Sequence, residues 1–382
     1  MAGLQDVVRS RLESAAGIQR ALEATAPKIV AVAGAMIRSL RTGGKIVLFG
    51  NGGSAADAQH IAGELVGRYY LDRRPLSAMA LTVNTSSLTA IANDHGFAQV
   101  FARQLESVGR RGDVAIGTST SGRSANVLEA LRVARRLGMV SVLLTGRGGE
   151  DAAAADYCLA VPSSDTPRIQ EAHILIGHLL CELVEANLCG PLNVQTVFLE
   201  RDGVVNPRNA GRDPVRWADF EFLPGAKEAL SRLSARQIRL IIVTNQQGIV
   251  RGQLTEAELE DLHGRMLSEL SREGARIDGV YYCPHDEGEC ACRKPRTGLF
   301  LRAQADFPDI EFERAAVIGD SLHDVEAGAR LGCRTILVGE GARAAAVAER
   351  AGRRHFVIDR VVPSLFNAAV EHLLADSRTA TL

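Results

Sequence analysis

An excess of charge of one sign is missing from this 382-residue sequence, because 44 basic side chains face 45 acidic ones and leave a net charge of −1. Such a chain has no long-range attraction to nucleic acid or to an anionic membrane surface, and we expect neither partner. Long apolar runs are also missing, since stretches such as 240–243 fall far short of the roughly 20 residues of a membrane-spanning helix. The start, with Asp6, Arg9 and Glu13, is too charged for a signal peptide, so the sequence predicts a cytoplasmic protein.

Lysine and cysteine are scarce, which makes their positions informative. Only 4 of the 44 basic residues are lysines, and Lys294 is one of them. Cysteine occurs seven times, an odd number, and three of the seven fall within residues 283–292. This pattern favours a metal site in a reducing compartment over a framework of disulfides.

Apolar strands alternate with helices along most of the chain. From Lys45 onward each strand is followed by a Gly- or Ser-rich turn and an amphipathic helix, which is typical of a parallel sheet with helices on both faces. A long helix at about 167–188 closes a first series, and a second series opens after Gly190. We therefore predict an α/β protein with two doubly wound parallel-sheet domains. They are expected at 1–190 and 194–360, followed by a C-terminal helix and frayed tail at 361–382.

Two turns at the ends of successive strands in the first half carry groups that suit a phosphate. Residues 50–54 (GNGGS) follow a strand and open a helix, so their backbone N–H groups can converge on an anion at the positive helix end. Residues 118–124 (TSTSGRS) concentrate hydroxyl groups at the next such turn. Either turn alone is compatible with ordinary turn and capping residues. Together they favour a phosphate monoester site, because open parallel sheets bind ligands at this edge.

Polar residues also gather on two helices of the first half. His60 and Glu64 are four residues apart and project from one helix face, as either a surface pair or two ligands of one ion. Gln170, His173 and His178 lie on the long apolar helix, where buried histidines require polar partners. Two such clusters favour a shared site over a surface pair.

The segments GNGGSAADAQHIAGEL, AIANDHGF, TSTSGRSAN and SSDTPRIQEAHILIGHLLCELVE together resemble the sugar isomerase (SIS) domain, and within it the phosphoheptose isomerases, over about residues 1–190. The resemblance implies a homotetramer that converts sedoheptulose 7-phosphate to D-glycero-D-manno-heptose 7-phosphate. It implies that Zn²⁺ is held by His60, Glu64, Gln170 and His178, with His173 as a core residue or a support for the ligands. It also implies contacts with the sugar phosphate from Asn51, Gly52, Gly53, Ser54, Asn93, Asp94, Ser119, Thr120, Ser121, Ser124 and Gln170.

Interconversion of a ketose and an aldose removes a proton from carbon and moves another between oxygens through an enediolate. We assign the base to Glu64 and the acid to His178. Eight residues of straight helix separate Gln170 from His178 by roughly 12 Å, too far for both to reach one ion. Either the helix begins irregularly at Gln170, or this residue comes from a neighbouring subunit, and we predict a site at a subunit interface.

Four motifs of the second half, VFLERDGVVN, VTNQQGIVRG, RKP and VIGDSLHDVEAG, resemble those of the haloacid dehalogenase (HAD) superfamily, over about residues 194–360. The resemblance implies a phosphatase that uses Mg²⁺ held by carboxylates. The implied magnesium ligands are Glu200, Asp202 and Asp320, with Asp202 as the general acid and Asp324 near Lys294. The implied contacts with substrate come from Thr244, Asn245, Arg293 and Lys294.

Three thiols and one imidazole lie close together in the second half. Cys283, His285, Cys290 and Cys292 suit a tetrahedral structural Zn²⁺ site, and a reactive thiol pair is the alternative. The loop CPHDEGECACRKP resembles that of the D-glycero-D-manno-heptose 1,7-bisphosphate phosphatases and also that of the histidinol-phosphate phosphatases. Fusion to a heptose isomerase favours the heptose substrate, although another small phosphomonoester remains an alternative.

Glu200 departs from the superfamily pattern, which places an aspartate nucleophile at this position. One additional methylene moves the carboxylate by more than about 1 Å, and such a misplacement can reduce a rate by roughly 100-fold. The substitution has three explanations: an engineered change, a natural loss that leaves a binding or scaffolding module, or a backbone adjusted to glutamate. We predict retained binding of Mg²⁺ and phosphate with weak turnover. A non-catalytic regulator that binds phosphosugars is the alternative for the whole chain.

Overall fold

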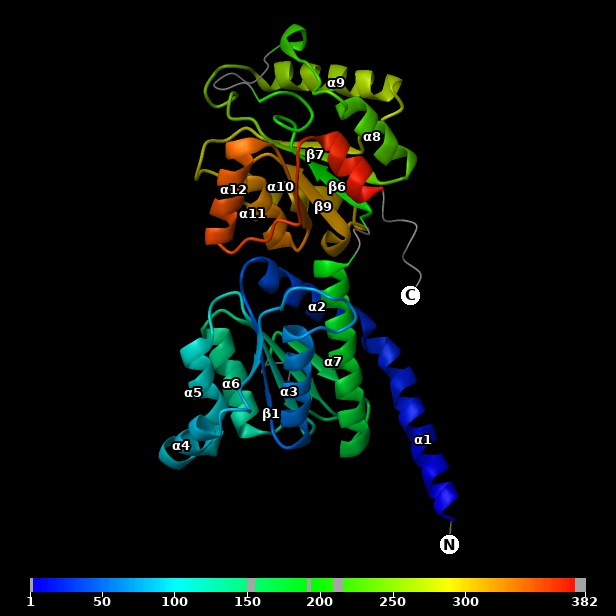
Figure 1. Cartoon of the computed structure of the whole chain (residues 1–382), viewed down its shortest axis with the longest axis vertical. Coiled ribbons are helices and arrows are strands. Elements are labelled where there is room, and N and C mark those ends of the chain that lie inside the picture. The colour runs from blue at the N-terminus through cyan, green and yellow to red at the C-terminus, as the bar shows by residue number, and fades with distance from the viewer. Residues whose placement is uncertain (1–2, 150–154, 191–193, 209–215, 375–382) are drawn as a thin grey trace. The chain divides into compact units, whose positions relative to one another are not determined.

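A parallel β-sheet forms the centre of each half of the chain in the computed structural model (Figure 1). The structure describes residues 3–149, 155–190, 194–208 and 216–374. The chain divides into two units, residues 1–190 and 191–382, and each has its own sheet and its own hydrophobic core. The predicted fold class, two parallel-sheet α/β domains, is confirmed.

The sheet of the first unit has the strand order β2-β1-β3-β4-β5, with every pairing parallel. Its strands are β1 (Ile46–Gly50), β2 (Ala78–Ala80), β3 (Val114–Ser119), β4 (Val140–Thr145) and β5 (Tyr157–Ala160). Alternate residues of β1 enter different cores: Ile46 and Leu48 pack on one face, and Val47 and Phe49 on the other. Since both faces are covered, the strand is apolar throughout and not alternating.

Helices cover both faces of this sheet (Figure 1). Helices α2 (Ala26–Arg41), α3 (Gly53–Val66) and α7 (Thr166–Cys189) pack on the face of Ile46, and α5 (Val100–Val108) and α6 (Ala125–Arg136) pack on the face of Val47. The remaining helical segments are α1 (Leu4–Ala21), η1 (Leu22–Thr25), α4 (Thr85–His95) and η2 (Phe97–Gln99). Helix α1 contributes no buried residue.

Helix α7 is long and apolar enough to cross a membrane by length and composition. Its apolar side chains have a different role here, because Ile176, Leu180 and Val184 are buried in the core shared with α2 and α3. Helix α7 is therefore a central packing element of the first unit.

The sheet of the second unit has the strand order β11-β10-β9-β6-β7-β8, again entirely parallel. Its strands are β6 (Thr196–Leu199), β7 (Arg239–Asn245), β8 (Gly279–Cys283), β9 (Ala315–Gly319), β10 (Arg334–Val338) and β11 (Arg360–Val362). Its helical segments are η3 (Trp217–Asp219), α8 (Ala226–Ala235), α9 (Glu256–Arg272), α10 (Gly298–Asp306), η4 (Phe312–Arg314), α11 (Leu322–Leu331), α12 (Gly341–Arg353), α13 (Leu365–Asn367) and η5 (Ala368–Leu373).

The second unit continues beyond residue 360. Strand β11 joins the sheet beside β10, and Leu365, Ala368 and Leu373 are buried in the unit's main core. The segment 361–373 is thus part of this unit and not an appendage, because its apolar side chains complete the core. The predicted frayed tail, residues 375–382, lies outside the described residues.

Strand register decides which turns meet at the edge of each sheet. Gly50 pairs with Thr118, so the turns after β1 and β3 lie side by side. In the second unit Leu199 pairs with Ile242 on one side and with Ile318 on the other. The polar residues that follow these three strands therefore meet at one edge, where parallel sheets bind ligands.

Candidate functional site

The turn between β1 and α3 presents its backbone at the sheet edge. Gly52 adopts φ = 57°, a conformation that disfavours any residue with a Cβ atom, and α3 begins at the next residue. The Asn51 side chain exchanges two hydrogen bonds with the Asn126 side chain of α6, at 2.9 and 2.8 Å. Ser54 is buried in the first turn of the helix. These contacts fix the turn and leave the exposed backbone of Gly52 and Gly53 at the helix N-terminus.

The hydroxyl-rich turn after β3 lies beside it. The Oγ atoms of Ser119 and Ser124 are 2.8 Å apart, and the Ser119 hydroxyl also accepts from the Ser124 backbone N–H at 3.3 Å. Ser121 is exposed and Thr120 is partly buried. The structure thus brings together the two turns that the sequence singled out.

Asn93 and Asp94 lie elsewhere, near the C-terminal end of α4. Both are exposed, and the Asn93 amide donates to Asp94 Oδ1 at 2.8 Å.

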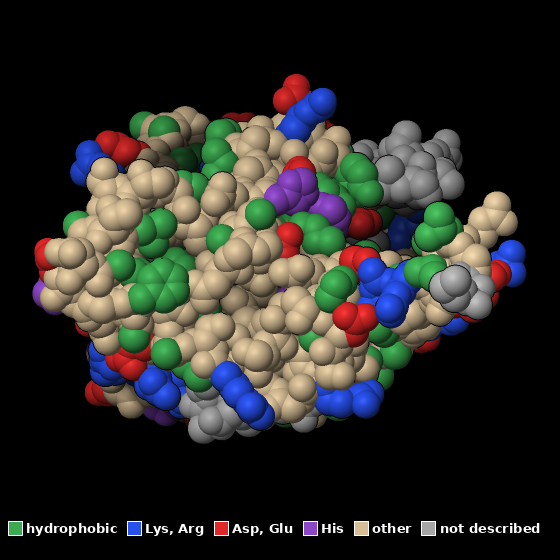
Figure 2. Space-filling view, turned by 90° about the horizontal axis from the view of Figure 1, so that it is seen from below, with side chains coloured by type: hydrophobic (Ala, Val, Ile, Leu, Met, Phe, Trp, Pro, Cys, Tyr) green, Lys and Arg blue, Asp and Glu red, His purple; other side chains and the backbone are tan. Residues whose placement is uncertain are grey.

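His60, Glu64 and His178 form a compact cluster on α3 and α7. The Nε2 atoms of His60 and His178 are 2.9 Å apart, and His60 Nε2 lies 3.5 Å from Glu64 Oε1. One ligand atom from each of the three residues lies within 4.8 Å of the others. The His60 side chain is 48% exposed, so an ion or substrate can approach the cluster from solvent. Figure 2 shows histidine side chains side by side at the surface of the molecule.

The donor set of this cluster suits Zn²⁺, which accepts imidazole nitrogen and carboxylate oxygen. Asp57, one turn before His60, keeps a buried Oδ2 atom without a hydrogen-bond partner. Burial raises the pKa of Asp57, while the nearby His60 lowers it. A buried carboxylate oxygen without a hydrogen-bond partner, near the His60 imidazole, fits a position next to a cation.

Gln170 does not join the cluster. Helix α7 is regular from Thr166, so the irregular start that would bring Gln170 toward His178 is not found. The Gln170 amide instead packs against Gly53, where any Cβ atom would overlap it, about two turns before His60 on α3. Because eight residues of regular helix separate Gln170 from His178, the two side chains of one chain do not reach the same ion.

His173 is a core residue. It is buried, and its Nε2 atom lies 3.2 Å from the Thr145 carbonyl oxygen while Nδ1 has no partner. Burial lowers the pKa of His173 to about 4, despite the hydrogen bond to Thr145. This histidine is therefore neutral over the physiological range.

In the second unit Glu200 follows β6 directly and is buried with Lys294 and Thr244. Thr244 Oγ1 donates to Glu200 Oε1 at 2.5 Å, the Arg201 backbone N–H donates to the same oxygen at 2.9 Å, and Lys294 Nζ donates to Oε2. Lys294 also donates to Asp324 Oδ1 at 2.6 Å. Burial, only partly offset by Lys294, raises the pKa of Glu200 to about 7.

Asp202 is held as a carboxylate by a different set of partners. The buried Arg201 guanidinium donates to both of its oxygens, with Nη2 at 3.0 Å from each, and the Asn206 and Gln246 amides donate at 2.8 Å. Burial raises the pKa of Asp202, but Arg201 and the two amides outweigh this effect and lower it. Arg201 in turn lies 3.0 Å from Nε2 of His263.

Asp320 follows β9 and lies against the turn at Gly203, where a Cβ atom would overlap its Oδ2. Arg208 donates to Asp320 Oδ1 at 2.6 Å and Arg343 donates to Oδ2 at 2.7 Å. Burial raises the pKa of Asp320 in spite of both guanidinium groups.

Carboxylates at adjacent strand ends are ligands that Mg²⁺ prefers, so the residue types fit the expected ion. The ligand atoms of the three predicted magnesium ligands lie farther apart than expected. Among the described residues, Glu200, Asp202 and Asp320 are not one of the groups whose ligand atoms all lie within 4.8 Å of one another. Each carboxylate instead has its own basic partner: Lys294, Arg201, or the pair Arg208 and Arg343.

The other two predicted substrate contacts border this site. Asn245 exchanges hydrogen bonds with the Lys294 backbone at 3.2 and 3.1 Å, so it positions the lysine. Arg293 donates to Gln247 Oε1 and to the His285 carbonyl oxygen, both at 3.2 Å.

Cys283, His285, Cys290 and Cys292 converge on one point. The three Sγ atoms lie 3.1 to 3.5 Å from one another, and His285 Nδ1 lies 3.4 Å from the sulfur of Cys292. The cluster cysteines Cys283, Cys290 and Cys292 form no disulfide with one another. Although partial burial raises it, hydrogen bonds from Cys292 and from the Arg293 backbone lower the pKa of Cys290 to about 6. Three cysteine sulfurs, one of which loses its proton readily, and one imidazole form the donor set of a structural zinc site.

The two units are similar to different families of known proteins. A family profile described as SIS domain matches residues 12–146. The phosphoheptose isomerase of Rhodospirillum rubrum is 52% identical over 187 residues, which are 49% of this chain and 100% of that protein. The chain belongs to the phosphoheptose isomerase family. The solved structure of the phosphoheptose isomerase from Neisseria gonorrhoeae is 43% identical and covers 48% of this chain and 100% of its own, with a TM-score of 0.46.

This member of the phosphoheptose isomerase family carries a HAD-like second unit. A family profile described as HAD-hydrolase-like matches residues 291–367. The solved structure of D,D-heptose 1,7-bisphosphate phosphatase from B. bronchiseptica, complexed with magnesium and phosphate, is 30% identical and covers 47% of this chain and 97% of its own, with a TM-score of 0.42. The phosphoheptose isomerase unit is thus followed by a HAD-hydrolase-like region.

One buried ion pair of the isomerase unit escaped the sequence analysis. Glu185 of α7 accepts from Arg73 Nε at 2.7 Å and from the backbone N–H groups of Tyr69, Tyr70 and Leu71 at 2.6 to 3.0 Å. This network fixes the loop after α3, and the Tyr69 ring lies 5.8 Å from that of His178. Nothing marks Arg73 among the many arginines of the sequence, so only the fold reveals it.

Proposed function

We propose that the first unit converts sedoheptulose 7-phosphate to D-glycero-D-manno-heptose 7-phosphate. The observation that carries this proposal is the cluster of His60, Glu64 and His178, whose ligand atoms lie within 4.8 Å of one another. These residues hold Zn²⁺, which when bound polarises the substrate oxygens. Glu64 removes the proton from carbon, and His178 moves a proton to or from oxygen. The turns at 50–54 and 118–124 bind the sugar phosphate.

We further propose a homotetramer whose active sites lie at subunit interfaces. Gln170 packs near Gly53 in its own chain, so its contribution to a zinc site comes from a second copy. Helix α1 supports assembly, because Leu4, Val8 and Leu12 are 87%, 59% and 66% exposed and recur on one helix face. In such an assembly Asn93 and Asp94 of a neighbouring copy complete the substrate site.

For the second unit we propose the C7 phosphatase of D-glycero-D-manno-heptose 1,7-bisphosphate, with weak turnover. Glu200, Asp202 and Asp320 hold Mg²⁺, while Lys294 and Thr244 bind the phosphate that is removed. The same lysine and threonine each donate a hydrogen bond to Glu200 in the structure, which also favours a second candidate, a phosphosugar-binding module without turnover. A panel that includes histidinol phosphate separates the substrates. The cytoplasmic location proposed for the chain rests on the cluster of Cys283, Cys290 and Cys292, since thiols that hold a metal suit a reducing compartment.

The deciding experiment assays the full chain for interconversion of the two heptose phosphates, before and after chelation, with Zn²⁺ added back. Activity that disappears with the metal and returns with Zn²⁺ supports the isomerase. A protein with full metal content that leaves both sugars unchanged would point to the regulator instead. Phosphate release from the bisphosphate is measured on the same preparation.

A further inference from the structure

Two arginines from different elements meet on one carboxylate at the expected magnesium site. Arg208 follows the turn after β6, Arg343 lies in the first turn of α12, and each donates to its own oxygen of Asp320, at 2.6 and 2.7 Å. The Asp320 side chain is 6% exposed, whereas those of Arg208 and Arg343 are 40% and 63% exposed. The carboxylate is therefore buried, whereas both guanidinium side chains reach solvent.

A divalent cation on Asp320 competes directly with these arginines. Mg²⁺ would bind the same two Asp320 oxygens that accept from the guanidinium groups, and its charge repels both groups at short range. When the cation binds, Arg208 and Arg343 must turn away from Asp320. Arg208 then keeps only a long hydrogen bond, 3.4 Å from its Nη2 atom to the Asp202 carbonyl oxygen, and the positive charge of each arginine has lost its paired carboxylate.

The space available to the displaced side chains is a cavity of about 560 Å³. Arg208, Arg343 and Asp320 line it together with Leu223, Val338 and Ser364. A cavity of this size is typical of small-ligand sites, which combine apolar walls with a few polar groups. Two arginines at its rim suit a phosphate, because a guanidinium group donates two parallel hydrogen bonds to phosphate oxygens.

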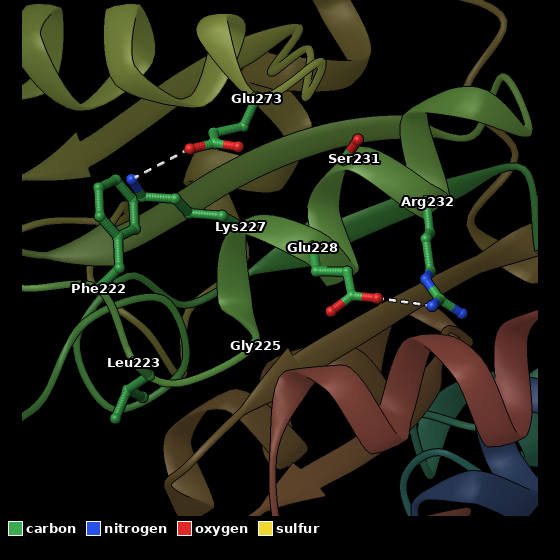
Figure 3. A pocket seen from close by; sticks show the side chains of 8 residues that line it. All are labelled: Phe222, Leu223, Gly225, Lys227, Glu228, Ser231, Arg232 and Glu273. Carbon is green, nitrogen blue, oxygen red and sulfur yellow. Dashed lines mark hydrogen bonds and ion pairs between the residues drawn. The ribbon is translucent and has the colours of Figure 1, made fainter.

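A second cavity of the same unit serves as a contrast. It has about 500 Å³ and is lined by Lys227, Glu228, Arg232 and Glu273, among others (Figure 3). Lys227 lies 3.7 Å from Glu273, and Arg232 donates to Glu228 at 2.6 Å. No cation from the catalytic region competes for these acids, so their bases stay paired. This cavity offers no anion site.

We propose that Arg208 and Arg343 form the binding site for the second phosphate of a sugar bisphosphate, the one that the phosphatase site does not remove. The two arginines hold Asp320 until the cation binds, and they then turn to the distal phosphate. This inference rests on the proposed phosphatase-type function of the second unit. It predicts that Mg²⁺ and the bisphosphate bind cooperatively, while a monophosphate lacks this gain.

The test uses the full chain and its Arg343→Gln variant, with Arg350→Gln as the control that removes the same charge from the exposed surface of the same helix. Calorimetric titration measures the affinity for Mg²⁺ alone, and then for D-glycero-D-manno-heptose 1,7-bisphosphate and its 7-phosphate in the presence of Mg²⁺. Phosphate release is followed in parallel so that the heat of turnover is subtracted. Arg208→Gln is a second variant, and circular dichroism checks the folding of each.

Arg343→Gln should weaken bisphosphate binding by about tenfold or more, the loss of a charged hydrogen bond pair, and leave 7-phosphate binding within about twofold. The same variant should bind Mg²⁺ at least as tightly as the parent, because a competitor for Asp320 is gone. Unchanged bisphosphate affinity in both arginine variants would overturn this inference and leave the phosphatase proposal intact. If the parent chain binds neither sugar phosphate with Mg²⁺ present, both proposals fail.

Discussion

The Nε2 atoms of His60 and His178 lie 2.9 Å apart, although 118 positions separate the two residues in the chain. Two ring nitrogens at this distance share one proton or approach one cation, because two protonated rings would repel each other. Helices α3 and α7 pack tightly enough to impose this contact, since a Cβ atom at Gly177 would overlap Ile61. Close helix packing thus builds the metal-type cluster.

Loss of one imidazole should abolish the isomerase. His178→Asn removes a ligand and the acid, so we expect interconversion to fall by at least about 100-fold. Zinc content, measured by mass spectrometry, should fall by one ion per chain while the structural zinc remains. His355→Asn is the control, because His355 is exposed and its positive φ suits asparagine. A variant that kept its full zinc content would contradict the ligand assignment.

Subunit mixing tests whether the site is shared. Gln170→Ala and His178→Asn each remove one side of the proposed composite site, so each homo-oligomer should be inactive. Unfolding and refolding the two together should recover activity that neither has alone, because mixed interfaces contain one intact site. Mixtures that remain as inactive as the separate variants would place Gln170 and His178 in the same protomer's site.

Shortening the nucleophile should activate the phosphatase. Glu200→Asp withdraws the carboxylate by one methylene, and we expect phosphate release to rise by roughly 100-fold if the added methylene misplaces it. Equal and fast rates for both proteins would refute the impairment. The parent's residual rate should rise as pH passes through about 7, since protonated Glu200 cannot attack phosphorus. A pH profile that is flat through neutrality would count against Glu200 as the attacking group.

The thiol cluster should stabilise the second unit only with its metal. Cys290→Ser removes a partly exposed ligand, so zinc content should fall and the thermal midpoint of this unit should decrease. Cys158→Ser changes a cysteine of the first unit and should leave zinc content unchanged. After chelation, the parent and Cys290→Ser should have the same thermal midpoint, because neither then holds the metal. If the variant is less stable than the parent even after chelation, Cys290 contributes through packing and not through zinc.

Acid should destabilise the first unit through His173. Its pKa is about 4 in the fold and 6.5 in the unfolded chain, so the unfolded state binds more protons between these values. The stabilising contribution is therefore complete above pH 6.5 and is lost as pH falls toward 4, on the order of 3 kcal/mol in total. In His173→Gln, urea unfolding should depend less on pH over this interval. His95→Gln, at an exposed position, should retain the parent's dependence.

The two-sheet architecture could be predicted from the sequence, because strands covered on both faces are apolar throughout and the turns between them carry Gly and Ser. The four-ligand cluster at 283–292 could also be predicted, since its members are close in the chain and a short loop must bring them together. His60 and Glu64 share a face by helix period alone.

Tertiary structure decided the relations between distant residues. Packing of α3 on α7 set His60 against His178, and the regular course of α7 carried Gln170 away from them. Strand register placed Glu200 beside Thr244. The carboxylates of Glu200, Asp202 and Asp320 nevertheless pair with different basic side chains, because long side chains from different positions extend to each of them. The pairing of Arg208 and Arg343 on Asp320 depends on three separate segments, and no local pattern encodes it. The spacing of residues along the chain determines which side chains lie together within one helix or loop. A site that several elements share depends on how those elements pack against one another.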